Sequence, residues 1–166
     1  FNFGYGRSGN VQTLRTLGAD RGFEVIEVPF IEMRLGKDRQ MTTCSSSQIR
    51  RFLEKGAVHN AAQLLTRPYR LMGEVVTGRG IGRSLGFPTA NVHPGGQILP
   101  SEGVYAGYVT VGDTLDEVCF GGVRRPAALS IGRAKTFVTD HPLLLEAHLL
   151  EDNVENLYGK WAGLEF

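Results

Sequence analysis

The chain has 166 residues, of which 42% are hydrophobic and 21% charged, with a formal net charge of +1. This composition predicts a folded globular protein and excludes an intrinsically disordered chain. Two cysteines, Cys44 and Cys119, provide neither a disulfide framework nor a metal-binding spacing, so we expect a reduced, cytoplasmic protein. No apolar run approaches the roughly 20 residues of a membrane span, so we expect no membrane partner.

The charge is unevenly distributed along the chain. Residues 1–70 carry 11 Lys and Arg against 6 Asp and Glu, whereas residues 71–166 carry 7 against 11. A basic first segment suits phosphate or nucleic acid as a partner, although a charge of this size is also ordinary for a solvated surface.

The first thirty residues have the pattern of an α/β nucleotide-binding unit. The chain opens on Phe1-Asn2-Phe3 without an initiator methionine and already resembles the end of a strand, so we expect a fragment. Gly4–Gly9 matches G-x-G-x-x-G, and Asn10 is a good N-cap for a helix that Gly22 can end. Phe23–Phe30 is predicted to be a strand. The order is therefore strand, loop, helix, strand.

A dinucleotide site is one interpretation of this unit. That fingerprint requires a complete preceding strand and an acidic residue about 20 positions on, at the end of the second strand. Only three residues precede the glycines here, and Glu27 falls in the middle of its predicted strand. The match is therefore weak on its own.

Two helices are predicted next, after an irregular polar stretch at Ile31–Thr43. Ser45–Ser47 offers an N-cap and hydroxyl donors where the first helix begins, and Gly56 can end it. The helix N-terminus attracts anions, but a plain amphipathic helix explains the same residues. Val58–Leu65 forms the second helix, and we place a domain boundary between residues 67 and 68 because Pro68 disfavours a helical residue before it.

Beyond Tyr69 the pattern changes to short strands separated by turns. The predicted strands are 71–77, 88–92, 104–111, 117–123, 127–131, 143–150 and 161–166, and 152–159 is a helical turn or a loop. Regular short strands with glycine turns and no long helix favour a small antiparallel barrel. The fold class is therefore α+β.

A glycine-rich basic loop follows the first of these strands. Gly78–Asn91 reads GRGIGRSLGFPTAN, and glycine reaches positive φ without steric cost, so such a loop can wrap its N–H groups around an anion. Side chains alternate along a strand, so Thr89 and Asn91 share one face and Ala90 takes the other. A hydroxyl beside a carboxamide can hold a metal–phosphate group. The alternative is a surface hairpin with a polar outer face.

Glu146 interrupts an apolar strand. Strand parity puts it on one face with Leu144 and His148, and puts Leu145 and Ala147 on the other. A carboxylate flanked by leucines can act as a general base in a cleft, although glutamate more often faces solvent without such a role. The histidines show no metal-like grouping and are predicted to be surface or structural residues: His59, His93, His141 and His148.

Several of these motifs stand in the order found in the riboflavin kinase family. They are Arg67-Pro68-Tyr69, GRGIGRSLGFPTAN, Gly103-Val104-Tyr105-Ala106, Ser130-Ile131-Gly132, LEAHLL and Leu157-Tyr158-Gly159. The sequence resembles that family over residues 68–166. The resemblance implies a six-stranded antiparallel β-barrel and an ATP-dependent transferase that phosphorylates riboflavin to FMN.

The resemblance also implies roles for individual residues. Thr89 and Asn91 would bind the Mg²⁺–ATP phosphates, with Thr89 as a metal ligand, and Glu146 would accept the proton of the riboflavin 5′-hydroxyl. The loop would cover the nucleotide with five further residues: Gly78, Gly80, Gly82, Arg83 and Gly86.

Residues 1–67 resemble the end of the adenylyltransferase domain in bacterial bifunctional riboflavin kinase/FMN adenylyltransferases. FGYGRSG and SSSQIR carry this likeness, which implies a partial α/β nucleotidyltransferase, Rossmann-like segment before the barrel. Phosphate contacts are implied for Arg7, Ser46 and Arg50. The H-x-G-H motif that the family uses for adenylyl transfer is absent, so we expect FMN adenylyltransferase activity to be lost or incomplete in this chain.

Three other functions stay open. One is that of a full bifunctional enzyme of which this chain is a piece. The family commonly has Asn-Pro-Thr-Phe where this chain has Ala134-Lys135-Thr136-Phe137, which permits a non-catalytic flavin- or nucleotide-binding module. A nucleic-acid-binding barrel wants basic residues on its strands, and the acidic balance of residues 71–166 counts against it. We therefore expect small-molecule partners, with no nucleic acid and an open oligomeric state.

Overall fold

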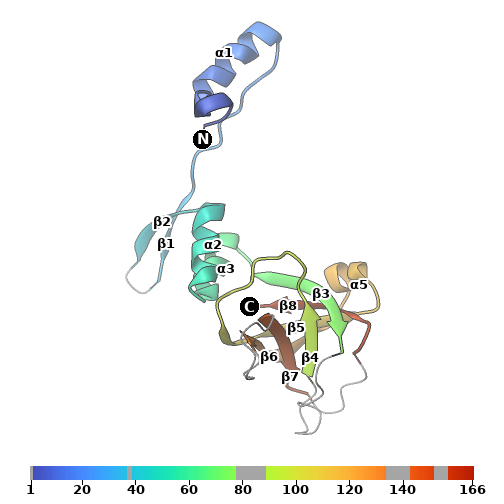
Figure 1. Cartoon of the computed structure of the whole chain (residues 1–166). Helices are drawn as coiled ribbons and strands as arrows, with labels where there is room; N and C mark the ends of the chain where they lie inside the picture. Colours follow the sequence, from blue (N-terminus) through green and yellow to red (C-terminus); the bar gives the residue numbers. More distant parts are fainter. Residues whose placement is uncertain (1, 37–38, 78–88, 134–142, 152–156) are drawn as a thin grey trace. The chain divides into compact units, whose positions relative to one another are not determined.

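The structure is a computed structural model that describes residues 2–36, 39–77, 89–133, 143–151 and 157–166. It divides into two compact units, Phe1–Glu32 and Met33–Phe166 (Figure 1).

The first unit contains the predicted N-terminal helix. A short 3₁₀ turn, η1 (Tyr5–Arg7), precedes α1 (Val11–Arg21). The Asn10 side chain accepts a hydrogen bond from the Thr13 backbone N–H at 3.1 Å, and the Thr13 hydroxyl oxygen accepts one from the Asn10 N–H at 3.2 Å. This reciprocal capping box fixes the start of the helix, and Gly22 ends it at φ 74°.

The strand predicted for Phe23–Phe30 is wrong. The structure gives this segment no regular secondary structure, and four of its apolar side chains are exposed: Phe23, Ile26, Val28 and Phe30. Apolar alternation gives a segment the propensity for a strand, but a strand also needs a neighbour to pair with its backbone. No strand within the described ranges pairs with this segment, so the second strand of the predicted α/β unit is not formed.

A short hairpin lies where the sequence predicted irregular structure. Strands β1 (Glu32–Leu35) and β2 (Gln40–Thr43) form a two-stranded sheet. Gly36 and Arg39 adopt positive φ values of 71° and 50° at the turn. The sequence of the two strands shows little apolar alternation, because Leu35 is the one residue in them that is buried.

The next two helices confirm the prediction. They are α2 (Ser46–Glu54) and α3 (Val58–Leu65). The Ser45 hydroxyl accepts a hydrogen bond from the Gln48 N–H at 3.2 Å, which caps α2. The two helices pack against each other through buried apolar residues: Leu53, Ala61 and Leu64.

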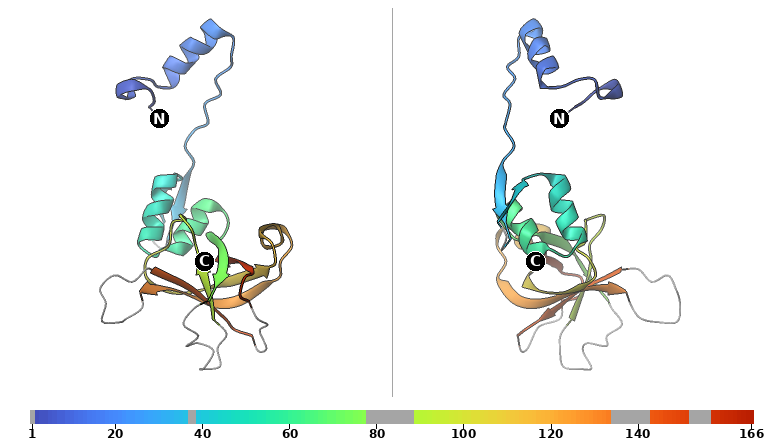
Figure 2. Two further views of the ribbon diagram at one scale, coloured as in Figure 1. Left: turned by 45° about the vertical axis from the view of Figure 1, so that its right-hand side comes forward. Right: turned by 90° about the vertical axis from the view of Figure 1, so that its left-hand side faces the viewer.

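Six antiparallel strands form a closed barrel (Figure 2), as predicted. They are β3 (Arg70–Val76), β4 (Thr89–His93), β5 (Gly103–Gly112), β6 (Arg124–Arg133), β7 (Leu143–Leu149) and β8 (Trp161–Glu165). Their order around the barrel is β3-β4-β7-β6-β5-β8. Closure gives every strand two neighbours and leaves no free sheet edge.

Aliphatic side chains fill the barrel interior. The core includes Leu71, Val75, Ala90, Val92, Val109, Leu129, Ile131, Leu145, Ala147, Leu149 and Leu164. On β7, burial alternates residue by residue, so Leu145, Ala147 and Leu149 point inward while their neighbours do not. The parity predicted from the sequence for this strand is therefore confirmed.

The strand predicted at residues 117–123 is wrong. Residues Leu115–Phe120 form the helix α5. The Thr114 hydroxyl accepts a hydrogen bond from the Glu117 N–H at 3.2 Å, and the Glu117 carboxylate accepts one from the Asp113 N–H at 2.8 Å. These caps, together with acidic residues in the first turn, favour a helix over the β-propensity of Val118. None of the helices in the described ranges has the length and apolar character needed to cross a membrane.

The α2–α3 pair packs against one part of the barrel. The Ser101 N–H, just before β5, donates a hydrogen bond to the Leu53 carbonyl at 2.9 Å. Val58 of α3 packs against the barrel core. Gly56, at φ 68°, lies so close to the Ser101 and Tyr105 hydroxyl groups that a Cβ there would collide with both. These helices thus share a compact unit with the barrel, and the predicted domain boundary between residues 67 and 68 stays a prediction.

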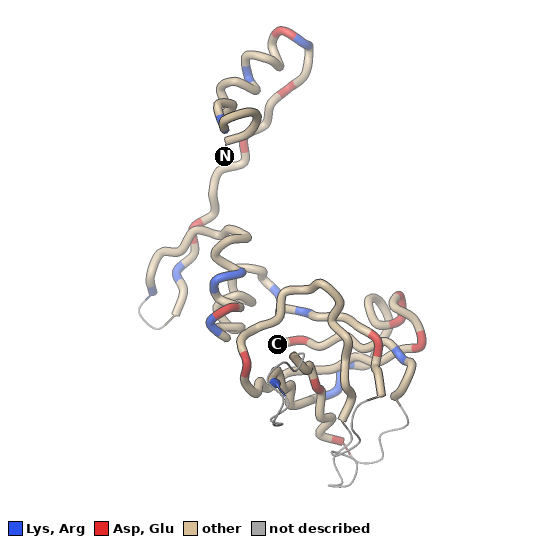
Figure 3. The backbone as a smooth tube through the Cα atoms, in the orientation of Figure 1, with Lys and Arg blue, Asp and Glu red and all other residues tan. Residues whose placement is uncertain are grey.

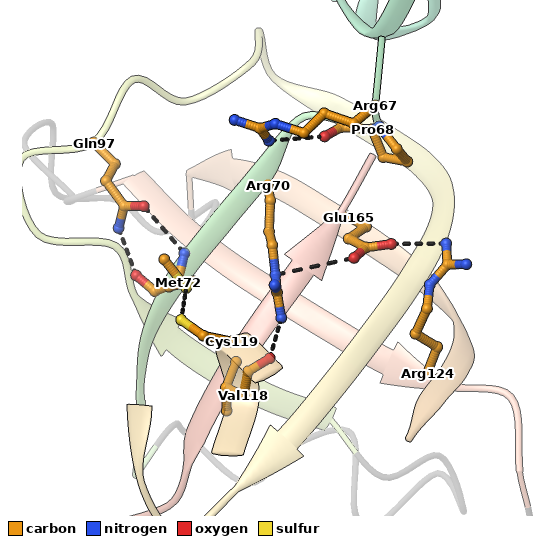
Figure 4. Close-up of polar contacts among 9 residues, drawn as sticks. All are labelled: Arg67, Pro68, Arg70, Met72, Gln97, Val118, Cys119, Arg124 and Glu165. Carbon is orange, nitrogen blue, oxygen red and sulfur yellow. Dashed lines mark hydrogen bonds and ion pairs between the residues drawn. The ribbon is translucent and has the colours of Figure 1, made fainter. Parts of the chain in front are cut away.

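A cluster of charged side chains connects α5 to strands β3 and β8 (Figure 4). Arg70 on β3 donates a hydrogen bond to the Val118 carbonyl of α5, and its Nε lies 4.0 Å from the Glu165 carboxylate of β8. The other Glu165 oxygen lies 2.7 Å from Arg124 Nη2. Because the Arg70 and Glu165 side chains are largely buried, their charges are partly shielded from water.

Candidate functional site

Strands β4 and β7 are neighbours in the barrel although they are far apart in the sequence. They pair antiparallel, with Thr89 opposite His148 and Asn91 opposite Glu146. The sequence therefore brings the predicted phosphate-binding residues and the predicted base together only through the topology of the barrel.

All four of these side chains lie on the outer face of the two strands. Ala90 and Ala147 lie between them in the sequence and are buried in the barrel core. Because side chains alternate along a strand, the flanking residues point the other way, and each is half-buried: Thr89, Asn91, Glu146 and His148. The predicted common face of Thr89 and Asn91 is confirmed.

The Asn91–Glu146 pair is the centre of this polar group. Directly opposite residues in an antiparallel pair have Cβ atoms about 4.5–5.5 Å apart, so these two positions carry a carboxamide and a carboxylate side by side. Ser130 of β6 lies opposite Glu146 on its other side, and Val104 of β5 lies opposite Ser130. Val104 is 75% exposed, so an accessible apolar side chain lies on the strand beyond Ser130.

Thr89 and His148 are joined directly. Thr89 Oγ1 lies 2.9 Å from His148 Nδ1, at hydrogen-bond distance. The prediction gave His148 only a surface or structural role. Its position two residues after Glu146 was the available signal that the two side chains share one face of a strand.

The donors at this face suit a hard cation held mainly by phosphate. Thr89, Asn91 and Glu146 offer hydroxyl, amide and carboxylate oxygens, which are the ligands that Mg²⁺ prefers. Among the described residues, no group of three or more His, Cys, Asp or Glu side chains could hold a metal by itself. Mg²⁺ commonly keeps water and substrate phosphate in its shell, so this sparse donor set fits a metal that arrives with a nucleotide.

The remaining predicted site residues are distributed elsewhere. Gly78, Gly80, Gly82, Arg83 and Gly86 lie outside the described residues. Arg7 belongs to η1 in the first unit, where it adopts φ 57°. Ser46 and Arg50 lie one turn apart on α2, and Arg50 Nη1 donates to the Ser46 hydroxyl at 3.5 Å.

The comparison with protein families gives a match over the barrel. The family described as Flavokinase: Riboflavin kinase matches residues 65–166, which include the whole barrel. The chain belongs to the riboflavin kinase family. The resemblance inferred from the PTAN and LEAHLL motifs is thus confirmed, and the barrel is the fold expected of this family.

Curated relatives extend the similarity over the whole chain. Each is called a bifunctional riboflavin kinase/FMN adenylyltransferase. The protein of Buchnera aphidicola subsp. Schizaphis graminum is 35% identical over 95% of this chain and 46% of its own length. The Haemophilus influenzae protein is 34% identical over 100% of the chain and 49% of its own, and that of Escherichia coli K12 is 35% identical over 96% and 46%. The chain spans about half the length of the curated relatives it matches.

A solved structure has a similar fold. It comes from Streptococcus pneumoniae and is described as a macrolide-efflux protein, with a TM-score of 0.74 and 26% identity. The likeness covers 99% of this chain and 48% of that one. The segment before the barrel is therefore shared with longer proteins as well.

Proposed function

We propose that this chain is an ATP-dependent riboflavin kinase that transfers the γ-phosphoryl group of ATP to the 5′-hydroxyl of riboflavin, giving FMN and ADP. The observation that carries the proposal is the Asn91–Glu146 pair. A carboxylate able to take a proton stands beside an amide and a hydroxyl able to bind phosphate, in a chain of this family.

Glu146 acts in this scheme as the general base. Its carboxylate accepts the hydrogen of the 5′-hydroxyl while that oxygen forms a bond to the γ-phosphorus and the bond to the ADP oxygen breaks. The proton stays on Glu146 and passes to water after FMN leaves. The opposing Asn91 carboxamide orients the phosphate chain by donating hydrogen bonds from its NH₂ group.

Thr89 would provide the protein oxygen that holds the metal of the nucleotide, and Asn91 would bind the phosphates beside it. Bound Mg²⁺ supplies positive charge that neutralises the developing charge on the phosphoryl oxygens. The glycine-rich loop, with Gly78, Gly80, Gly82, Arg83 and Gly86, would cover the phosphates and exclude water from them. In the sequence, the segment 78–88 immediately precedes Thr89, where β4 begins.

We also propose that residues 1–67 are the end of an FMN adenylyltransferase-like α/β domain. The similarity of the bifunctional relatives, which runs through this segment, supports this assignment. Arg7, Ser46 and Arg50 would be its phosphate contacts. The H-x-G-H motif is absent from the chain, so we expect it to form FMN without converting FMN to FAD.

The expected partners are small molecules in the cytoplasm. The two cysteines are free thiols, which fits a reducing compartment. Residues 71–166 carry more Asp and Glu than Lys and Arg, and Figure 3 shows basic residues scattered among acidic ones on the barrel. The described part of the barrel shows no basic stripe of the kind that a nucleic-acid-binding barrel presents, so we expect no nucleic-acid partner.

The test is incubation of the protein with riboflavin, Mg²⁺ and ATP, followed by chromatography for FMN, ADP and FAD. We expect equal amounts of FMN and ADP and no FAD. Riboflavin binding without FMN formation would instead support a non-catalytic flavin-binding module. Absence of both riboflavin binding and FMN would overturn the proposal.

A further inference from the structure

The hydrogen bond between Thr89 and His148 connects a proposed phosphate-binding residue to a side chain to which the proposed reaction gives no role. We propose that His148 is a positioning residue, whose Nδ1 accepts the Thr89 hydroxyl hydrogen and thereby turns the lone pairs of that oxygen toward the metal–phosphate group. The inference rests on the proposed function, because it concerns the orientation of a residue that the kinase site uses.

The geometry makes His148 the natural partner of Thr89. The two residues are directly opposite in the β4–β7 register, on the same outer face, and their side-chain atoms are 2.9 Å apart. On the other side of His148, the opposing residue of β6 is Ala128, whose methyl group offers no hydrogen bond. Two residues lie opposite His148 on the neighbouring strands, Thr89 and Ala128. Of these, Thr89 is the one whose side chain can hydrogen-bond to the imidazole.

The direction of this hydrogen bond follows from the chemistry of a hydroxyl ligand. A threonine oxygen that faces a cation must point its hydrogen away from it, and that hydrogen then needs an acceptor. A neutral imidazole has one acceptor nitrogen and one N–H. When Nδ1 accepts from Thr89, Nε2 carries the hydrogen and the imidazole occupies neither lone pair of the Thr89 oxygen. The opposite tautomer would donate to Thr89 and occupy one of them.

The size of the effect can be bounded. A single side-chain hydrogen bond contributes about 0.5–1.5 kcal/mol, so losing the restraint on the Thr89 hydroxyl should weaken Mg²⁺–nucleotide binding about two- to ten-fold. The effect should vanish when the Thr89 hydroxyl itself is absent. This dependence distinguishes a residue acting through Thr89 from one that merely supports the fold.

A double-mutant cycle tests the dependence, with Mg²⁺–ADP affinity measured by calorimetry. His148→Phe keeps a ring but removes the acceptor, and His148→Asn keeps an oxygen acceptor near the position of Nδ1. We expect His148→Phe to weaken binding two- to ten-fold in the natural chain and to have no effect in a Thr89→Val background. We expect His148→Asn to restore most of the lost affinity.

The tautomer is measurable without substitution, by nitrogen-15 NMR of the histidine side chains at mildly alkaline pH. An unprotonated Nδ1 on His148 is expected, and a protonated Nδ1 would overturn the proposal. Equal losses from His148→Phe with and without the Thr89 hydroxyl would do the same, as would failure of His148→Asn to restore affinity.

The outcomes also separate this inference from the kinase assignment. If the expected affinities and tautomer are found but no FMN forms, the kinase assignment fails while the positioning role of His148 stands. If FMN forms but the cycle is additive, the kinase assignment stands and the positioning role fails. If Mg²⁺–ADP does not bind to the natural chain, both fail.

Discussion

Asn91 and Glu146 face each other across the β4–β7 pair, on the outer surface of the barrel. The immediate neighbours of each residue in its own strand are apolar and buried: Ala90 and Val92 flank Asn91, and Leu145 and Ala147 flank Glu146. The polar pair is created by pairing two strands whose inner faces build the core. Stability and site geometry therefore depend on the same register.

Glu146→Gln is expected to lower FMN turnover by about 10²-fold or more, the scale of losing a general base. The amide keeps the shape of the carboxylate but cannot accept the proton. Mg²⁺–ADP affinity should change little, which calorimetry would check alongside steady-state kinetics. Unchanged turnover would remove Glu146 from the mechanism.

Gly73→Ala is expected to destabilise the protein, because a Cβ on Gly73 would overlap the backbone carbonyl of His93 on the paired strand β4. Overpacking of this kind costs about 1–3 kcal/mol, and the obstructing atom is backbone that cannot rotate away. Gly132→Ala is the matched control, since a Cβ on this β6 residue meets no atom of the described residues within 4 Å. Urea unfolding should show a lower midpoint for the first variant alone, and equal midpoints would show that β3 and β4 are not packed as described.

Glu165→Gln is expected to cost about 1–3 kcal/mol of folding stability, because it removes the charge that pairs with Arg70 and Arg124 (Figure 4). The Arg70 Nε is buried and makes no hydrogen bond in the described structure. The charge of the nearby Glu165 carboxylate therefore offsets the cost of burying the Arg70 charge. Glu151→Gln breaks the more exposed pair with Arg125, at 3.8 Å, and should change stability by less than about 1 kcal/mol. Similar losses in both variants would contradict the special role of the buried cluster.

The pH dependence of stability should include a contribution from Tyr69. Burial raises the pKa of Tyr69 above its ordinary value, and the nearby charge of Arg67 partly opposes this shift. The folded state therefore holds the phenolic proton more tightly than the unfolded state, so this stability is present below the unfolded pKa of about 10 and is lost as pH rises through the folded pKa. Tyr69→Phe should flatten the decline of thermal midpoint above about pH 10 relative to the natural chain. An identical decline in both proteins would contradict the shift.

Tyr69→Phe should also cost about 0.5–1.5 kcal/mol at neutral pH. The Tyr69 hydroxyl donates a hydrogen bond to the Ile98 carbonyl at 2.6 Å, and the phenylalanine ring cannot replace it. Chemical unfolding at pH 7 measures this cost separately from the alkaline effect.

Local chemistry explains which elements could be predicted. Asn10 and Ser45 carry capping side chains, and the helices α1 and α2 begin where these residues predict. Strand parity likewise predicted the shared face of Thr89 and Asn91, because alternation is a property of the strand alone. The T-x-x-E pattern at Thr114–Glu117 was an available helix signal, and the β-propensity of the following residues obscured it.

Long-range pairing explains what could not be predicted from the residues themselves. Phe23–Phe30 alternates like a strand, yet a strand forms only where another backbone pairs with it. In the same way, nothing local to Thr89 or His148 indicates that β4 and β7 are neighbours, so their hydrogen bond could not be foreseen. The roles of Thr89, Asn91 and Glu146 came from the resemblance and remain predictions.

The contact between α2 and the start of β5 has a practical consequence for dissecting this protein. Cutting the chain at Pro68 would isolate the strands but strip away the Leu53 carbonyl that receives the Ser101 N–H, along with the Val58 side chain. The apolar barrel surface that this cut exposes would then favour self-association of the fragment. A recombinant fragment that contains the barrel should accordingly start near Met33, where the compact unit starts.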